Sequence, residues 1–181
     1  MTSFSKHILI AFSIILLIPL KNFSQNTQHK TSSKERLIEA AKDIMATATT
    51  CALITVNDNR PMVRVMDPFP PESDFTVWFG TNPKSRKVNQ IKKNPKVTLY
   101  YLEKDASGYV VIHGIAQLVN DQAEKEKRWK DEWEAFYPDN SESYLLIKVS
   151  PEWMEVISYK HDIIGDTATW KPPFLVFDSK D

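Results

Sequence analysis

The sequence has little cysteine and little glycine: its 181 residues include one cysteine and four glycines. A single cysteine excludes an internal disulfide, so packing alone must stabilise the fold. The formal net charge is +0, which argues against nucleic acid as the main partner. The chain has no internal repeat and no low-complexity segment. Its length suits one domain with a sizeable core better than two.

Residues 1–24 are predicted to be a secretory signal peptide. Lys6 precedes the apolar run 8–18, and Ser24 is a small residue suited to the position before a cleavage site. The run is short for a membrane span, which needs ~20 residues. An uncleaved membrane anchor is the alternative interpretation.

The rest of the chain is predicted to be a polar linker, residues 25–34, followed by one domain, residues 35–181. We expect an exported, periplasmic protein. It would touch a membrane only if the N-terminal segment is retained as an anchor.

Hydrophobic periodicity predicts a helix followed by an antiparallel sheet. A capping box at Ser32–Glu35 opens a helix of about four turns. Asn57-Asp58-Asn59 is typical of a hairpin turn. The strands are expected at residues 50–56, 61–67, 75–79, 96–102, 109–119 and 144–149, the last broken by Pro151 and resumed over 153–159. Repeated βαβ units are absent, which favours a closed antiparallel barrel.

Aromatic residues follow a second capping box at Asp121–Glu124. Trp129, Trp133, Phe136 and Tyr137 stand at helical spacing and are expected to form core or to wall a pocket. Phe174–Phe177 suggests a final short strand, and we assign no role to the segment Gly165–Phe177 as a whole.

Two residues with reactive side chains are interpreted as structural. Cys51 lies in an apolar strand, where a small buried residue is expected rather than a nucleophile. His113 has no second His or Cys at metal-ligand spacing, so no metal site is predicted.

The segment Thr81–Ile91 carries the clearest functional pattern. A strand leads through a polar loop to Ser85, a good N-cap, and Arg86 and Lys87 fall in the first helical turn. Cations at that position oppose the helix dipole, so the sequence predicts that they hold an anion there. Backbone N–H groups, a hydroxyl and two cations together suit a phosphate.

Arg64 stands in the middle of a short strand, on the face opposite Val63 and Val65. Its position alone is compatible with an exposed strand arginine or with an arginine directed at a bound anion.

These patterns together resemble the FMN-binding split barrels related to pyridoxamine 5′-phosphate oxidase, and within them the general stress protein 26 branch. The resemblance covers roughly residues 35–160. It is carried by four segments: Arg64-Val65-Met66, Phe79-Gly80-Thr81-Asn82, Ser85 to Ile91, and Asn94-Pro95-Lys96-Val97.

The resemblance implies an antiparallel split β-barrel that forms a homodimer with two FMN sites at the subunit interface. It places Arg64, Arg86 and Lys87 on the phosphate, with Ser85 nearby. It places the backbone of Val65 and Met66, with Gly80 and Thr81, along the flavin. It thereby favours the anion-binding interpretation of Arg64.

The sequence departs from the oxidase itself. The oxidase has a Tyr where Gly80 stands, a Gln near Tyr109 and a C-terminal Arg- and His-containing substrate segment that this chain lacks. In place of the Lys that follows the arginine strand, this chain has Asp67–Pro70. Vitamin B6 oxidation is therefore not expected.

Three functions are compatible with the sequence. The first is a flavin-dependent oxidoreductase of unknown substrate, in which the flavin carries the redox chemistry and no side chain is assigned a catalytic role. The second is a non-enzymatic flavin-binding stress protein or carrier. The third is a plain barrel used for protein contacts, with Arg86 and Lys87 solvated.

Overall fold

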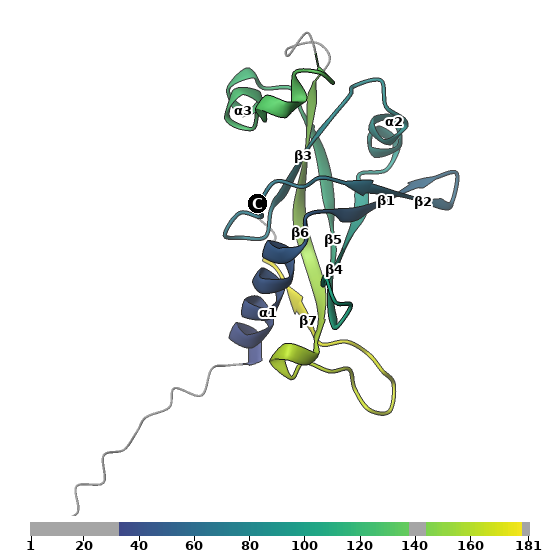
Figure 1. The fold of residues 1–181 in the computed structure, drawn as a ribbon. Coiled ribbons are helices and arrows are strands. Elements are labelled where there is room, and N and C mark those ends of the chain that lie inside the picture. Colours follow the sequence, from purple (N-terminus) through teal and green to yellow (C-terminus); the bar gives the residue numbers. More distant parts are fainter. Residues whose placement is uncertain (1–32, 138–143, 179–181) are drawn as a thin grey trace, which may run out of the picture. The chain divides into compact units, whose positions relative to one another are not determined.

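Seven strands form one antiparallel sheet in the computed structural model, which describes residues 33–137 and 144–178 (Figure 1). Contacts divide the chain into Met1–Lys30 and Thr31–Asp181, and every described helix and strand belongs to the second unit. The predicted signal peptide and nearly all of the predicted linker lie outside the described residues. Within those residues, no helix is both long and apolar enough to cross a membrane.

The strands and helices follow the predicted order. The strands are β1 (Cys51–Asn57), β2 (Arg60–Met66), β3 (Val77–Thr81), β4 (Lys96–Leu102), β5 (Gly108–Val119), β6 (Leu145–Ser158) and β7 (Phe174–Val176). The helices are α1 (Ser33–Thr47), α2 (Arg86–Lys93) and α3 (Gln122–Lys127), with 3-10 turns η1 (Asp131–Trp133) and η2 (Tyr159–His161).

The sheet is an open, split barrel. Its strand order is β2-β1-β4-β5-β6-β3, with β7 paired to β6, and every pairing is antiparallel. The strands at the two ends, β2 and β3, do not pair with each other in the described part of the chain. The expected split barrel is confirmed, but the expected closure is wrong, because a seam remains between β2 and β3.

The main core lies between α1 and the inward face of the sheet. Alternate strand residues such as Leu53, Leu99 and Ile112 are fully buried there, and Ile44 packs against them from α1. The predicted apolar stripe of α1 is confirmed by the burial of Leu37, Ala41, Ile44 and Met45. Burial of this kind contributes roughly 1.5–3 kcal/mol per large side chain, which is how the domain is stabilised without a disulfide.

The β1–β2 hairpin has a two-residue turn at Asp58 and Asn59. Both have positive φ, 48° and 61°, as a type I′ turn requires. The register pairs Leu53 with Arg64, so Arg64 shares the inward face of Leu53. Val63 and Val65 therefore point the opposite way.

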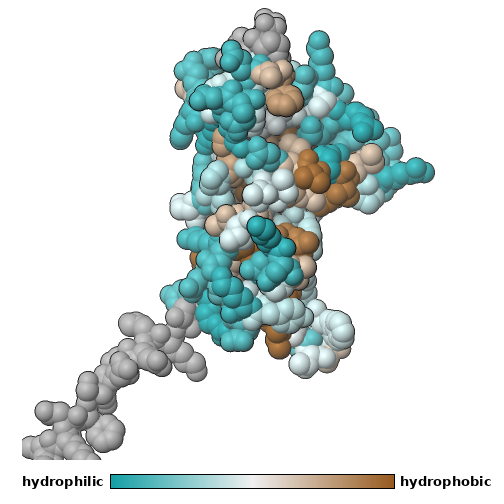
Figure 2. Space-filling model, in the orientation of Figure 1, coloured by the Kyte–Doolittle hydropathy of each residue, from teal (hydrophilic) through white to brown (hydrophobic). Residues whose placement is uncertain are grey.

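Val63 and Val65 are 65% and 72% exposed. Figure 2 shows an apolar patch over the β1–β2 hairpin. An apolar pair on the outer face of an end strand is unusual for a surface that remains in water.

The predicted break of the sixth strand at Pro151 is wrong. β6 runs continuously past it, and Pro151 lies opposite Gly114 on β5. The register shifts between His113 and Gly114, which leaves Glu152 as the extra residue of a bulge that accommodates the proline. The expected close approach at Gly114 is confirmed, because a Cβ there would lie 2.3 Å from the Ser150 carbonyl oxygen.

Two other predicted boundaries shift. β3 begins at Val77 rather than Phe75, because Phe75 has a φ of 65° and its N–H donates to the Glu72 carbonyl at 2.9 Å. Asp121 caps α3 as expected, accepting from the Glu124 N–H at 2.9 Å. However, α3 ends at Lys127, so the aromatic residues 129–137 do not lie on one continuous helix.

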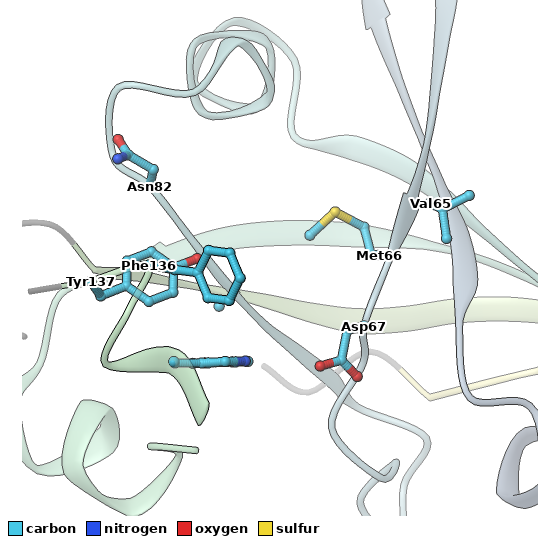
Figure 3. Close-up of a pocket in the computed structure, with 8 residues that line it drawn as sticks. Val65, Met66, Asp67, Asn82, Phe136 and Tyr137 are labelled. Atoms are coloured by element: carbon cyan, nitrogen blue, oxygen red, sulfur yellow. The ribbon is translucent and has the colours of Figure 1, made fainter. Parts of the chain in front are cut away.

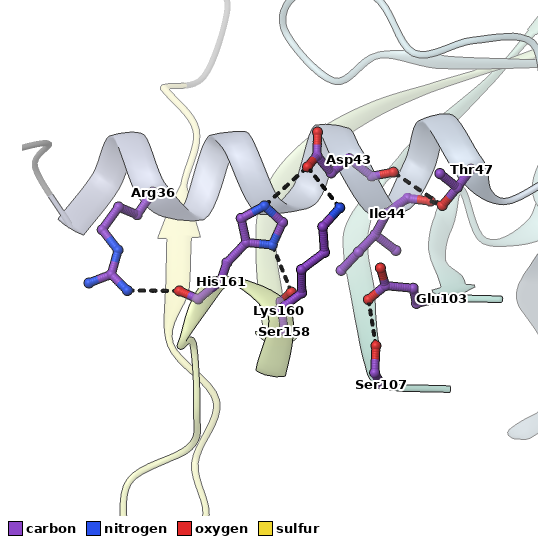
Figure 4. A network of polar contacts seen from close by, with 9 residues as sticks. All are labelled: Arg36, Asp43, Ile44, Thr47, Glu103, Ser107, Ser158, Lys160 and His161. Atoms are coloured by element: carbon purple, nitrogen blue, oxygen red, sulfur yellow. Dashed lines mark hydrogen bonds and ion pairs between the residues drawn. The ribbon is translucent and has the colours of Figure 1, made fainter. Parts of the chain in front are cut away.

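The C-terminal segment fastens α1 to the sheet. The expected final strand is confirmed as β7, and Phe177 contacts Phe75 with ring centroids 5.6 Å apart. His161 bridges Asp43 of α1, at 3.1 Å, and the Ser158 hydroxyl, at 2.9 Å (Figure 4). Arg36 donates to the His161 carbonyl at 2.7 Å. The first helix is thus held by residues more than a hundred positions later.

Candidate functional site

A cleft lies along the seam between β2 and β3. Met66 of β2 and Gly80 of β3 both line it, and its volume is about 410 Å³. Figure 3 shows Phe136 and Tyr137 across the cleft from Met66 and Asp67. The other lining residues are Val65, Asn82 and Trp133. Four predicted flavin-site residues belong to these two strands: Val65, Met66 and Gly80 line the cleft, and Thr81 follows Gly80.

One end of the site carries the three cations Arg64, Arg86 and Lys87, and we call it the cationic end. It begins at Thr81, where β3 ends. Lys87, in the first turn of α2, donates from Nζ to Thr81 Oγ1 at 2.9 Å. The Thr81 and Ser85 hydroxyls are 3.2 Å apart. The polar loop between strand and helix therefore gathers an ammonium and two hydroxyls.

Ser85 occupies the N-cap position of α2, but its side chain does not cap the helix. Its backbone is extended, with φ −68° and ψ 148°, and the hydroxyl makes no cap hydrogen bond. The hydroxyl is directed at Thr81 instead. The predicted position is confirmed, and the predicted capping interaction is wrong.

Arg64 reaches this region from β2 through a polar network beneath the sheet. Its Nη1 donates to Thr55 Oγ1 at 2.7 Å and to the Leu53 carbonyl at 3.3 Å, and its Nη2 donates to Gln90 Oε1 at 2.7 Å. The Thr55 hydroxyl also donates to Gln90 Oε1, at 2.6 Å. Arg64 is therefore a positioned, half-buried arginine rather than a free surface one.

Three cations gather here without an anionic partner. In residues 33–137 and 144–178, none of Arg64, Arg86 and Lys87 forms an ion pair with a carboxylate. Burial, and then the neighbouring Arg86, lower the pKa of Arg64. Burial, and then the neighbouring Arg64, lower the pKa of Lys87. Like charges that destabilise one another in this way are relieved by a bound anion.

An aromatic wall covers the Gly80 end of the cleft. A Cβ on Gly80 would lie 2.4 Å from a ring carbon of Trp133, so Trp133 occupies the space that a side chain at position 80 would need. Trp133 is held edge-on by Phe69 and Tyr144, each with ring centroids 5.5 Å away. The expected wall is confirmed for Trp133, Phe136 and Tyr137. Trp129 packs against the same aromatic cluster and lines a separate hollow beside α3.

The sequence interpretation missed four residues of the site. Thr55 and Gln90 orient Arg64, and Asp67 and Asn82 line the cleft. Gln90 had a recognisable pattern, because it is a polar residue beside the buried Val88 and Ile91 of α2. Thr55 similarly continues the inward series of Cys51 and Leu53.

The sequence matches a known family over residues 33–164, described as pyridoxamine 5′-phosphate oxidase like. The chain belongs to this pyridoxamine 5′-phosphate oxidase-like family. The match spans α1, all strands up to β6, and η2, and so it includes every residue of the cationic end and of the cleft. No curated protein matches the sequence.

Solved structures of similar fold include general stress proteins, in agreement with the resemblance seen in the sequence. General stress protein 26 from Bacillus anthracis str. Sterne is 26% identical, with a TM-score of 0.62, over 78% of this chain and 99% of that chain. A protein related to general stress protein 26, from Clostridium acetobutylicum, is 21% identical, with a TM-score of 0.61, over 68% and 89%. A heme binding protein from Mycobacterium smegmatis is 14% identical, with a TM-score of 0.56, over 68% and 55%.

Proposed function

We propose that this member of the pyridoxamine 5′-phosphate oxidase-like family binds FMN in the cleft between β2 and β3. The single observation that carries the proposal is the cluster of Arg64, Arg86 and Lys87, which lie close enough to perturb one another electrostatically and have no described carboxylate partner. Lys87 donates to the Thr81 hydroxyl, which lies 3.2 Å from the Ser85 hydroxyl. A phosphate monoester offers the charge and acceptor oxygens that this set of donors needs.

The cleft beside the cations suits the remainder of the cofactor. Thr81 and Arg64 adjoin the cleft residues Gly80 and Val65 in the chain, so a ligand anchored at the cations extends into the cleft. There Met66 and the aromatic side chains supply apolar surface for a planar ring. Family membership supports a flavin as that ring.

When bound, the flavin would supply the redox chemistry of an oxidoreductase. The chain's own residues hold the phosphate, orient the ring and exclude water from one side of it with the aromatic wall. A flavin carrier without turnover is the second candidate, and it is favoured by the Asp67–Pro70 loop, which replaces the lysine of the oxidase.

We further propose that the protein is a homodimer with the cofactor at the subunit interface. Val63 and Val65 support this proposal, because they form an exposed apolar pair on an end strand and Val65 also lines the cleft. Covering an apolar patch with a second copy removes it from water. In this arrangement a single chain forms only part of the flavin site.

The test is a titration of the purified protein with FMN and with riboflavin, which lacks the phosphate. We expect FMN to bind at micromolar concentration or below. Arg86→Ala combined with Lys87→Ala should weaken FMN about 100-fold or more, from the loss of two charged hydrogen bonds of ~1.5–3 kcal/mol each. Riboflavin affinity should change little.

The matched control is Lys92→Ala with Lys93→Ala. It removes the same charge from the exposed C-terminal end of the same helix, and FMN affinity should stay near the wild-type value. Equal weakening of FMN and riboflavin would show that the cations do not hold the phosphate. Tight binding of haemin with no binding of flavin would instead assign the cleft to a different cofactor.

Two further measurements separate the remaining alternatives. Reduction of bound flavin by NADH or NADPH with turnover indicates an enzyme, and its absence indicates a carrier. Val65→Glu should convert a dimer, measured by light scattering, to a monomer with weakened FMN binding. A wild-type monomer that binds FMN fully would contradict the shared site.

A further inference from the structure

The cleft between β2 and β3 has a carboxylate at the end away from the cations. Asp67 directly follows β2 and lines the cleft (Figure 3). It lies three residues beyond Arg64, or ~10 Å along an extended chain. Among the lining residues that the structure describes, Asp67 alone has a side chain that is charged at pH 7. A ligand held by its phosphate at the cationic end and extended through the cleft therefore reaches Asp67.

Lys130, in the segment between α3 and η1, orients this carboxylate from outside the cleft. Its Nζ donates to Asp67 Oδ2 at 2.6 Å. The same ammonium lies 4.9 Å from the ring centroid of Phe69 and 5.2 Å from that of Trp133. Lys130 itself does not line the cleft. The ion pair therefore fixes Asp67 beside the aromatic wall and leaves the cleft side of the carboxylate open.

The second carboxylate oxygen of Asp67 is available to a ligand. Within residues 33–137 and 144–178 only Oδ2 accepts a hydrogen bond, and the Asp67 side chain is 53% exposed. A molecule in the cleft can therefore reach Oδ1. A carboxylate oxygen accepts strong, charge-assisted hydrogen bonds from N–H groups, and it repels an anionic group.

The ring of an oxidised flavin carries one N–H group, between two carbonyl groups, and its other polar ring atoms are acceptors. This N–H loses its water partner when the ring enters the cleft, so it needs an acceptor from the protein. Asn82 lies beside the cationic end, and its Oδ1 already accepts from the Lys84 backbone N–H at 2.8 Å. The Tyr137 hydroxyl is an uncharged and weaker acceptor. Asp67 is the strongest acceptor that the described lining offers.

We propose that Asp67 is a flavin-binding residue whose Oδ1 accepts a hydrogen bond from the ring N–H, and that Lys130 is the positioning residue that holds it. The inference rests on the proposed function, because it assigns a further residue to the same FMN site. The two ends of the cleft then recognise opposite features of one ligand. The cations hold the phosphate, and the carboxylate selects a ring that carries an N–H.

The test compares FMN with 3-methyl-FMN, in which a methyl group replaces the hydrogen of that N–H. Both ligands keep the phosphate. Each is titrated into the full-length protein, and binding is followed by flavin fluorescence. We expect the wild type to bind FMN about 10-fold or more tightly than 3-methyl-FMN, from the loss of one charged hydrogen bond. Asp67→Ala removes the acceptor and leaves room for the methyl group, so it should bind the two flavins equally.

The role of Lys130 is tested by the ratio of the two affinities. Lys130→Met should lower this ratio about 2- to 5-fold, because Asp67 loses the partner that orients it. Lys130→Arg can donate to the same carboxylate and should restore the ratio. A merely structural role of Lys130 would lower both affinities and leave their ratio unchanged. Asn82→Ala is the matched control in the cleft and should keep the wild-type ratio.

Three results would overturn the proposal while FMN still binds. They are equal affinity of both flavins for the wild type, an unchanged ratio in Asp67→Ala, and loss of the ratio in Asn82→Ala. In each of them Arg86→Ala with Lys87→Ala can still weaken FMN, so the proposed function stands without the role of Asp67. Absence of FMN binding by the wild type would instead contradict the proposed function, and the role of Asp67 with it.

Discussion

Arg64 and Gln90 are 26 positions apart, and a 2.7 Å hydrogen bond from Nη2 to Oε1 joins them. The bond fixes the guanidinium of an end strand against the helix whose first turn carries Arg86 and Lys87. A single amide oxygen thus sets the geometry of the cationic end.

Replacing Gln90 with Leu should release the Arg64 side chain from its fixed position at the cationic end. The variant keeps the volume but removes the acceptor of both Arg64 and Thr55, so we expect stability to fall by about 1–3 kcal/mol. FMN should bind about 10-fold more weakly, whereas riboflavin should not. Asn89→Leu, on the exposed side of the same helix, is the control, and an equal effect there would refute the positioning role of Gln90.

Lys87→Met should stabilise the ligand-free protein and weaken FMN binding. The pKa of Lys87 is lowered in the folded protein, so between that pKa and the unfolded value of 10.5 the folded state binds fewer protons than the unfolded chain. The contribution of Lys87 to the free energy of unfolding therefore rises with pH through this window. At pH values below the window, the charged side chain destabilises the folded protein.

Removing that charge should raise the Tm of the ligand-free protein at pH 7 by about 1–3 °C. The difference should shrink as the pH approaches 10.5, while FMN binding at pH 7 is weakened. Thermal unfolding at several pH values measures this. Lys84→Met removes an exposed lysine from the same loop and should leave the Tm unchanged, and a pH-independent gain in Lys87→Met would contradict the explanation.

Gly80→Ala should destabilise the aromatic wall. The new methyl group would meet Trp133 at 2.4 Å and Tyr144 at 2.7 Å, and overpacking of this kind costs about 1–3 kcal/mol. If the clash with Trp133 is the cause, the cost of Gly80→Ala should largely disappear in a Trp133→Leu background. Urea denaturation of the four proteins gives the coupling, and strictly additive effects would show that Trp133 is not involved.

Asp43→Asn should weaken the contacts that hold α1 to His161 and Lys160, and so lower the free energy of unfolding. The carboxylate accepts from His161 at 3.1 Å and from Lys160 at 3.5 Å, and partly exposed pairs of this type contribute about 0.2–1 kcal/mol. We expect a loss within that range in urea denaturation. Glu39→Gln, at an exposed carboxylate of the same helix that makes no ion pair within residues 33–137 and 144–178, should cost less.

Much of the fold could be predicted from local sequence because local chemistry determines it. Asp58-Asn59 forms its turn with positive φ at both residues, and Lys96–Leu102 forms a strand at the expected bounds. Pro151 was misleading because its effect depends on its partner. Opposite a glycine and beside a bulge the strand continues, and neither feature can be seen near Pro151 in the sequence.

The site was predictable where its residues are consecutive. Ser85, Arg86 and Lys87 form a recognisable pattern at a helix start, and the structure brings Arg64 to them. The supporting residues were harder to identify, because Thr55 and Gln90 contribute through one hydrogen-bond network that spans two strands and a helix. Trp133 was expected in a wall, but its contact with Gly80 depends on how the segment after α3 folds back.

The attachment of α1 to the C-terminal segment has a consequence for synthesis. The first helix packs against β5, β6 and β7 and is clamped by His161. The ribosome produces the N-terminus first, so α1 cannot pack against β5, β6 and β7 until nearly the whole domain has been made. The apolar stripe of α1 therefore stays unburied until the C-terminal segment has been made.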